Sequence, residues 1–274
     1  MLEINVPENI KMPVGRFLDR AYPLFDFRNA FKKRDIKING ARASKDETVK
    51  TGDIITAYVN ADTSIEITEG KNGLIAAVKP QGLSVDKDEN GIAVDTAVTR
   101  VQAVYPSAKL CHRLDAMTGG VLVFALDDDS YEKARAAFKD HDIVKRYKAV
   151  CAGGFDKKRF VYSDALVKDA KASTVHIARP NERGMASETI GEVLIDNGKF
   201  ALVELEPVTG RTHQLRAHLS YHKHPILGDD KYGDRLINRE TTTRLKLWCE
   251  YINIMDCEFY APAPFDDFVN RLII

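Results

Sequence analysis

Long apolar runs and cysteine pairs are the first features that this sequence lacks. No stretch approaches the roughly eighteen consecutive apolar residues of a membrane-spanning helix, and no charged leader followed by an apolar run stands at the N-terminus. We therefore expect a cytoplasmic protein that has no membrane partner. The 4 cysteines show no CxxC spacing, which favours buried, reduced thiols over a disulfide framework.

An excess of basic charge is also absent, because 40 Lys and Arg residues balance 40 Asp and Glu residues. Proteins that coat nucleic acid usually have a high pI, since they neutralise phosphates. The length of 274 residues is enough for one large core and a small second domain. Composition is therefore compatible with most soluble enzymes and identifies none of them.

Basic residues nevertheless gather in one segment near the N-terminus. Between residues 28 and 50, eight basic side chains stand against three acidic ones. The segment is a candidate phosphate-contacting face, although most charge runs are simply solvated helix surfaces. Two short helices over 13–20 and 27–31 are predicted before a strand, turn and strand over 36–40 and 52–59. The side chains predicted to contact phosphates here are Arg28, Lys32, Lys33 and Arg34.

The rest of the chain is rich in strands. Residues 60–72 are polar and turn-rich, which predicts a linker between a small domain over 1–59 and a large one over 73–274. Strand-heavy sequence with segregated helices predicts an α+β fold. The expected strands cover 74–78, 121–125, 147–152, 173–177, 187–195, 200–206 and 250–257, and the expected helices cover 130–138 and 212–221.

Segment 112–120, His-Arg-Leu-Asp-Ala-Met-Thr-Gly-Gly, is the most informative part of the chain. Asp115 stands beside an arginine on a Gly-containing turn, and the apolar run 121–125 follows at once. This layout is typical of a carboxylate fixed at the floor of a cleft. Turns before strands also carry Asp and Gly for backbone reasons alone. The segment by itself therefore leaves a structural and a catalytic interpretation open.

The same segment resembles the signature His-Arg-Leu-Asp-x-x-Thr-Ser-Gly of the RluA family of RNA pseudouridine synthases. Segment 77–85 resembles the family's first motif, an apolar strand that runs into Lys-Pro-x-Gly, and segment 144–150 resembles the strand that carries its active-site tyrosine. Segments 210–219 and 224–233 resemble its third motif block. The motifs keep their order, and the resemblance covers roughly residues 73–274.

Two positions depart from the family pattern. Gly119 stands where the signature has serine, so any hydrogen bond that this serine makes is absent. Near residues 247–249 the family often has Leu-His-Ala, whereas this chain has Leu-Trp-Cys, with Trp248 in place of histidine. Both departures indicate a variant subgroup.

The resemblance implies a mixed, largely antiparallel sheet with a central catalytic cleft, and it implies conversion of uridine to pseudouridine in RNA without a metal or cofactor. Asp115 would be the catalytic carboxylate. At an ordinary pKa of about 3.9, an aspartate is ionised at neutral pH and available as a nucleophile. Tyr147 would stack on the target uracil, and its hydroxyl could move a proton. Arg211 would hold the Asp115 carboxylate by a charge-assisted hydrogen bond.

The resemblance also implies that the target nucleotide is flipped out of its stack. Arg113 would fill the space that the base leaves. His112 is placed beside it, although a hydrogen-bonded turn histidine is at least as good an interpretation, and Lys79 of the first motif is counted among the RNA contacts. The N-terminal pattern resembles the small RNA-binding domain named after ribosomal small-subunit protein four. We expect a structured RNA partner, ribosomal RNA rather than transfer RNA.

Three other interpretations are open at this point. The crowding of His213, His218, His222 and His224 suggests a metal site, but no glutamate or cysteine pair supports it. The acidic triplet 127–129 could serve a phosphotransferase, yet acidic residues also suit a helix start. The chain could also be an RNA-binding protein that has lost catalysis, although a pure binder has no need of the predicted catalytic residues.

Overall fold

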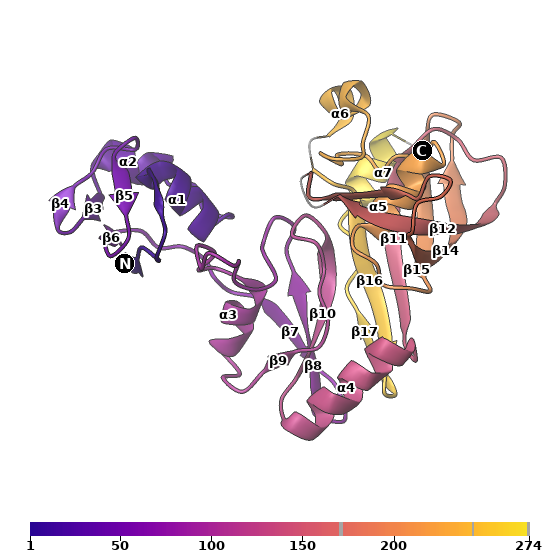
Figure 1. Ribbon diagram of the computed structural model, residues 1–274, viewed down its shortest axis with the longest axis horizontal. Coiled ribbons are helices and arrows are strands. Elements are labelled where there is room, and N and C mark those ends of the chain that lie inside the picture. Colours follow the sequence, from indigo (N-terminus) through magenta and orange to yellow (C-terminus); the bar gives the residue numbers. More distant parts are fainter. Residues whose placement is uncertain (170–171, 243, 273–274) are drawn as a thin grey trace. The chain divides into compact units, whose positions relative to one another are not determined.

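The computed structural model describes residues 1–169, 172–242 and 244–272 of the chain. It divides into two compact units (Figure 1). The first consists of Met1–Glu66 with Gly82–Ala108, and the second of Ile67–Gln81 with Lys109–Ile274. The sequence predicts a boundary at a linker over 60–72. In the structure the chain enters the second unit at residue 67, returns to the first unit for residues 82–108, and enters the second unit again at residue 109. Residues 273 and 274, the end of the predicted catalytic domain, lie outside the described residues.

The N-terminal unit packs two short helices against small sheets. Strands β1, β6, β3 and β4 form one sheet in that order, while β2 pairs with β5. In α1, apolar residues recur at helical spacing, so Val14, Phe17, Leu18 and Ala21 are all buried on one face. The element bounds are β1 Leu2–Asn5, β2 Lys11–Pro13, α1 Val14–Ala21, α2 Arg28–Lys33, β3 Ile36–Ile38, β4 Ala41–Arg42, β5 Thr48–Lys50 and β6 Ile54–Ala57.

Residues 82–108 belong to this unit because they supply part of its core. The backbone N–H groups of Val94 and Asp95 donate to the carbonyl of Ala21 at the end of α1, and Ile92 is fully buried in the same apolar cluster. Helix α3 (Ala97–Gln102) then begins at Thr96, whose side chain accepts a hydrogen bond from the Thr99 N–H.

The second unit is built on one large mixed sheet. Its strand order is β13-β12-β14-β15-β11-β16-β10-β8-β7, with β17 paired to β16 and β9 paired to β10. Strands β10 and β16 are parallel. The bounds are β7 Glu66–Glu69, β8 Leu74–Lys79, β9 Lys109–Leu110, β10 Gly119–Ala125, β11 Val144–Ala152, β12 Arg159–Asp169, β13 Thr174–Ile177, β14 Met185–Asp196, β15 Phe200–Pro207, β16 Leu247–Ile254 and β17 Cys257–Tyr260.

Helices in this unit are few and flank the sheet (Figure 1). Helix α4 begins after Asp127, whose side chain accepts from the Ser130 N–H at 2.8 Å, and it ends at His141 in the left-handed region. The acidic triplet 127–129 is thus the cap and first turn of a helix. The helices are α4 Asp128–Asp140, α5 Gln214–Tyr221, α6 Arg235–Thr241 and α7 Asp266–Leu272.

The predicted α+β class and the mixed, mostly antiparallel sheet are confirmed. Each predicted strand lies on an observed one, but the expected strand over 250–257 is wrong at its C-terminal end. There the chain turns at Met255 and Asp256, which both have positive φ, and β17 begins as the second arm of a hairpin. No helix in the described part of the chain is long and apolar enough to cross a membrane.

Candidate active site

Four neighbouring strands align one residue each in a row across the centre of the sheet. Gly120 of β10 is the register partner of Lys79 on β8 and of Cys249 on β16, and Cys249 is in turn the partner of Tyr147 on β11. The turn that carries Asp115 leads directly into β10. The register therefore brings Tyr147, from a strand far along the sequence, close to the Asp115 turn.

The Asp115 turn is held through its backbone. The Thr118 N–H donates to the Asp115 carbonyl at 3.0 Å. Lys79 Nζ donates to the Ala116 carbonyl at 2.9 Å, and Gln81 Nε2 donates to the Met117 carbonyl at 3.1 Å. Since its neighbours are tied down in this way, the half-buried Asp115 carboxylate has a fixed position.

Arg216, on the first turn of α5, supplies the positive charge next to Asp115. Its Nη1 lies 3.5 Å from Asp115 Oδ2. The same guanidinium forms a bidentate pair with Asp229, through Nε to Oδ2 at 2.7 Å and Nη2 to Oδ1 at 2.8 Å, and Nη2 also reaches Asp230 at 2.9 Å. Only 3% of the Arg216 side chain is exposed. A buried guanidinium fixed by two carboxylates presents its remaining nitrogen to Asp115 with little freedom to move.

Charge and burial act against each other in this cluster. Burial favours a lower pKa for Arg216, but the hydrogen bonds and charge of Asp229 outweigh it and raise the pKa. Burial would raise the pKa of Asp229, and the hydrogen bonds and charge of Arg216 lower it instead. The pair therefore stays ionised, which gives the Asp115 carboxylate a permanent cationic neighbour.

His213 approaches the same oxygen of the Asp115 carboxylate, with Nε2 3.7 Å from Oδ2. Its Nδ1 is 2.9 Å from the Tyr232 hydroxyl, which accepts the Val175 N–H at 2.7 Å. The Asp115 carboxylate next to Nε2 favours the tautomer with the imidazole proton on Nε2, in which the Tyr232 hydroxyl donates its proton to Nδ1. Burial lowers the pKa of His213, although the Asp115 charge works against this. A neutral N–H thus faces the carboxylate.

Tyr147 is buried in the same region. Its pKa is raised well above the ordinary value by burial, and the neighbouring Cys249 and Asp115 add to this effect. The side chain is therefore a neutral phenol that can stack as an aromatic ring and donate a proton.

Arg211 does not have the position that the sequence predicts for it. Its Nε donates to the Ala186 carbonyl at 3.2 Å, and its backbone N–H donates to Gln214 Oε1. We correct the assignment, because helix α5 begins at Gln214 and not at Thr212. Arg211 therefore lies in the preceding turn, while Arg216 stands on the helix and faces inward.

Lys79 is the second correction. The sequence places it among the RNA contacts, but its side chain is fully buried and donates to the Pro80 and Ala116 carbonyls. An ammonium group in that position has no access to a phosphate. Burial lowers its pKa to about 7, and the Asp115 charge opposes the shift. Lys79 supports the Asp115 turn from inside the unit.

His112 and Arg113 point in different directions. His112 stacks on Phe138 of α4 at 4.6 Å between ring centroids, and its Nε2 accepts the Val123 N–H at 3.1 Å. This is the arrangement of a turn histidine that anchors a strand, and burial lowers its pKa to about 3. Arg113 is exposed. Of the two, Arg113 is the one that can extend into a bound RNA.

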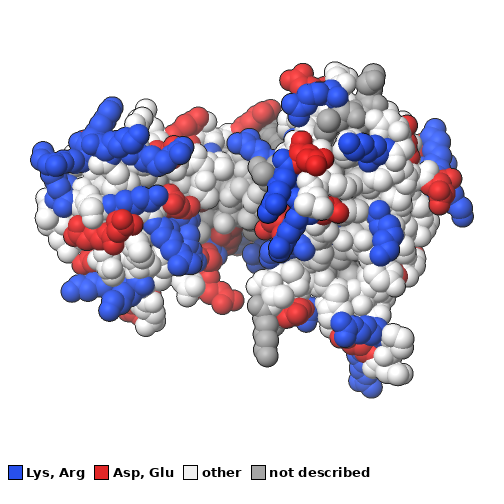
Figure 2. All heavy atoms as spheres, turned by 90° about the horizontal axis from the view of Figure 1, so that it is seen from above, with Lys and Arg blue, Asp and Glu red and all other residues white. Residues whose placement is uncertain are grey.

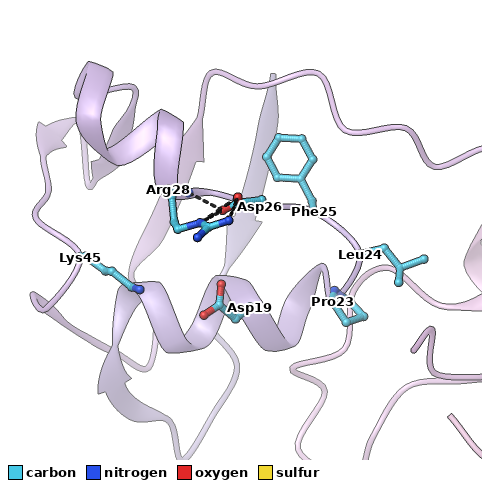
Figure 3. A pocket seen from close by; sticks show the side chains of 7 residues that line it. All are labelled: Asp19, Pro23, Leu24, Phe25, Asp26, Arg28 and Lys45. Carbon is cyan, nitrogen blue, oxygen red and sulfur yellow. Dashed lines mark hydrogen bonds and ion pairs between the residues drawn. The ribbon is translucent and has the colours of Figure 1, made fainter. Parts of the chain in front are cut away.

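The predicted RNA contacts of the N-terminal unit are all exposed and lie on or beside α2. Figure 2 shows Lys and Arg side chains projecting from this unit. Arg28 differs from the others because its guanidinium is paired with Asp26 at 2.6 Å. The two residues lie beside a shallow hollow of about 340 Å³ (Figure 3), which is lined by Asp19, Pro23, Leu24, Phe25, Asp26, Arg28 and Lys45.

Three of the histidines suspected of metal binding, His213, His218 and His222, have hydrogen-bond partners, while the ring of His224 stacks on Phe155. His218 contacts Ser187 and Thr189, and His222 lies 2.8 Å from Asp164. Over the residues that the structure describes, no group of three or more His, Cys, Asp or Glu side chains could hold a metal ion.

Sequence reasoning missed Arg216, His213, Asp229 and Tyr232 as parts of one network. All four lie in segments that carry the family resemblance, so the signal was present as residue types. Which of them face Asp115 depends on where α5 begins and on the turn after it. Neither follows from residue spacing alone.

The sequence and the structure of this chain are both similar to those of known proteins. Residues 73–221 match the family described as RNA pseudouridylate synthase. A relative from Rickettsia conorii, named ribosomal large subunit pseudouridine synthase C, is 32% identical in an alignment that covers 86% of this chain and 86% of the relative. A Salmonella typhi protein named tRNA pseudouridine synthase C is 33% identical over 64% of this chain and 72% of its own length.

A solved structure agrees with the sequence relatives. Human RNA Pseudouridylate Synthase Domain Containing 1 superimposes with a TM-score of 0.66 at 27% identity, over 76% of this chain and 86% of that one. The matched family segment contains the Asp115 turn, Tyr147 and Arg216, which are the residues that the sheet register and α5 bring together. This chain belongs to the RNA pseudouridylate synthase family.

Proposed function

We propose that this chain converts uridines of large-subunit ribosomal RNA to pseudouridine in the cytoplasm, with Asp115 as the catalytic carboxylate. One observation carries the proposal: Asp115 Oδ2 lies 3.5 Å from Nη1 of the buried Arg216 and 3.7 Å from Nε2 of His213, and the buried phenol of Tyr147 is a neighbour of the same carboxylate. The relatives named for the large ribosomal subunit, which match 86% of the chain in the best-covered case, support the choice of RNA.

The reaction breaks the bond between uracil N1 and ribose C1′ and forms a bond between C5 and C1′. The C5 proton is removed and N1 gains a proton, so product and substrate are isomers and no oxidant is consumed. Asp115 would act on the ribose or the base as a nucleophile, or stabilise positive charge that develops on the ribose. Arg216 would hold this carboxylate in position.

Tyr147 would contribute a ring and a proton. Stacking of an aromatic side chain on a base is worth about 1 to 3 kcal/mol, and a neutral phenol can move a proton late in the reaction. Arg113 is exposed on the same turn as Asp115, so its planar guanidinium could take the place of the flipped uracil. The exposed basic residues of α2 would hold the RNA through its phosphates.

Chemical mapping of pseudouridine across total RNA, in cells with and without this gene, tests the proposal. We expect one or a few sites in large-subunit ribosomal RNA to disappear and to return when the wild-type chain is supplied. Loss of sites in transfer RNA alone would overturn the choice of substrate and leave the reaction intact. If no site disappears in any RNA, the reaction itself is contradicted.

A further inference from the structure

The two positions that depart from the family pattern meet in space. Gly119 begins β10, immediately after the Asp115 turn, and its register partner on β16 is Trp248. A Cβ atom added to Gly119 would lie 2.6 Å from Trp248 Cε3 and closer still to Cζ3. Real Cβ atoms essentially never approach so closely. With tryptophan at 248 in this position, residue 119 has no room for a side chain.

The indole has little freedom to move aside. Its Nε1 donates to the Ala261 carbonyl at 2.8 Å, and only 7% of the residue is exposed. The ring belongs to an apolar cluster with Val150, Phe265 and other buried side chains. Because protein interiors are close-packed, a shift of this ring would disturb several neighbours at once. A side chain at 119 would therefore displace the start of β10 more easily than it displaces Trp248.

The start of β10 is also connected to the catalytic turn. The same added Cβ would lie 3.0 Å from Gln81 Cγ, and Gln81 Nε2 donates to the carbonyls of Met117 and Leu245. Gln81 thus joins the Asp115 turn to the chain that enters β16. A displacement at Gly119 would reach the Asp115 backbone through Gln81 and through the intervening peptide bonds.

We propose that Gly119 and Trp248 form a matched pair that sets the position of the Asp115 turn, and that Trp248 is therefore a positioning residue for the reaction. The inference rests on the proposed function. The two departures from the family pattern, glycine at 119 and tryptophan at 248, then depend on each other, because the indole fills the space that a side chain at 119 would occupy.

A double-mutant cycle with Gly119→Ser, Trp248→His and the combined variant tests the pair, since these substitutions introduce the residues of the family pattern. The substrate is total ribosomal RNA from cells that lack the gene, and pseudouridine is counted by mass spectrometry after nuclease digestion. We expect Gly119→Ser to lower kcat by roughly tenfold to a hundredfold, because a misplacement of about 1 Å at a catalytic group has effects of this size. KM should stay within about twofold, because substrate binding is not altered.

The combined variant is decisive. If the two positions are matched, histidine at 248 makes room for serine at 119, and kcat should return to within roughly threefold of the wild type. Losses that simply multiply in the combined variant would overturn the proposal, and so would wild-type kcat in Gly119→Ser. If Gly119→Ser does not fold, the combined variant still decides, because the proposal requires it to fold and to be active.

Gly70→Ser is a matched control within the same unit. A Cβ at Gly70 would lie 2.9 Å from Phe259 Cε1, so this glycine is also pressed against a buried ring. Gly70 donates its N–H to the Leu74 carbonyl, at the end of β8 opposite to Lys79, which is about 17 Å away at strand spacing. We expect Gly70→Ser to lower Tm without lowering kcat. An equal fall in kcat would mean that Gly119→Ser acts through stability alone.

The cycle is read in Tm as well as in activity. If the wild-type chain forms no pseudouridine in ribosomal RNA, the proposed function fails, and the Tm values still test the pair. Recovery of Tm in the combined variant supports matched packing. A loss of Tm equal to the sum of the two single losses contradicts it. The two failures are therefore distinguishable.

Discussion

The region around Asp115 and the α2 face of the N-terminal unit both carry positive charge, but they hold it in opposite ways. Next to the Asp115 carboxylate and beneath its turn, Arg216 and Lys79 are buried and have several partners each, as Arg216 has Asp229 and Asp230. On α2 the basic side chains are exposed. Buried and partnered charge has a fixed geometry that salt hardly screens, while exposed charge is mobile and strongly screened. The first suits chemistry at one atom, and the second suits attraction of a phosphate backbone.

Tyr147 gives the largest expected effect within the buried region. Replacement Tyr147→Phe keeps the ring and removes the hydroxyl, so we expect kcat to fall by roughly 10²- to 10⁴-fold, the usual contribution of a positioned proton donor. KM should change little because stacking is retained. Single-turnover rates on ribosomal RNA measure the effect. A wild-type rate in Tyr147→Phe would restrict Tyr147 to stacking.

Arg216 and Arg211 form a natural pair of variants. Arg216→Met leaves the buried Asp229 without its partner, which typically costs about 3 to 5 kcal/mol of unfolding free energy, and it removes the cation next to Asp115. Arg211→Met removes an exposed hydrogen bond to a backbone carbonyl and should cost at most about 1 kcal/mol. Urea unfolding together with kcat compares the two. Equal loss of activity in both variants would break the assignment of the Asp115 contact to Arg216.

Lys79 makes the stability of the protein depend on pH. Its pKa is about 7 in the native state, against an ordinary value of 10.5, so between these limits the unfolded chain binds more protons. The free energy of unfolding therefore rises by about 1.4 kcal/mol per pH unit between pH of about 7 and pH 10.5. Below pH of about 7, Lys79 is protonated in both states and does not make the free energy of unfolding depend on pH. Lys79→Met should remove this rise.

Urea unfolding at pH 6.5, 7.5 and 9 measures the difference between the wild type and Lys79→Met. The exposed Lys157 is a suitable control, because Lys157→Met should leave the pH dependence of the wild type unchanged. A Lys79→Met profile that parallels the wild type would show that Lys79 keeps an ordinary pKa despite its burial.

The basic residues on and beside α2 give the smallest expected effect, and they should affect RNA binding and not the chemical step. The combined variant Lys32→Ala, Lys33→Ala, Arg34→Ala should raise KM for ribosomal RNA roughly tenfold and lower the salt dependence of binding by about one unit of slope for each phosphate that is no longer neutralised. The chemical step should be unchanged. The same number of charges removed from α4, at Lys133, Arg135 and Lys139, is the control. An equal rise of KM in the control would mean that α2 has no special part in RNA binding.

Much of the fold can be predicted from the sequence because buried strands and helices show a characteristic pattern of apolar residues. Strand β10 is an unbroken apolar run and is buried along its whole length. Strand β12 escaped prediction because the polarity of its residues does not follow their burial: the apolar Val161 is exposed next to the buried Tyr162, and two acidic residues lie within the strand. Segment 82–108 gives no local sign that it completes the core of the N-terminal unit.

The site was predictable in its residue types and not in their partners. Asp115 and Tyr147 could be picked out because motifs carry them. The choice between Arg211 and Arg216 depends on the residue at which α5 begins, and the burial of Lys79 depends on how the Asp115 turn folds back over β8. These are tertiary facts, set by packing between segments that are far apart in the chain.

Asp115→Asn tests the central claim most directly. The amide has nearly the shape of the carboxylate but neither its charge nor its nucleophilicity. Pseudouridine formed in ribosomal RNA is counted for the wild type and the variant at equal protein concentration, and RNA affinity is measured alongside. We predict no pseudouridine above the level without enzyme, with RNA affinity within about threefold of the wild type because the exposed basic residues of the protein are unchanged. Pseudouridine formation by Asp115→Asn at the wild-type rate would contradict the assignment of Asp115 as the catalytic carboxylate.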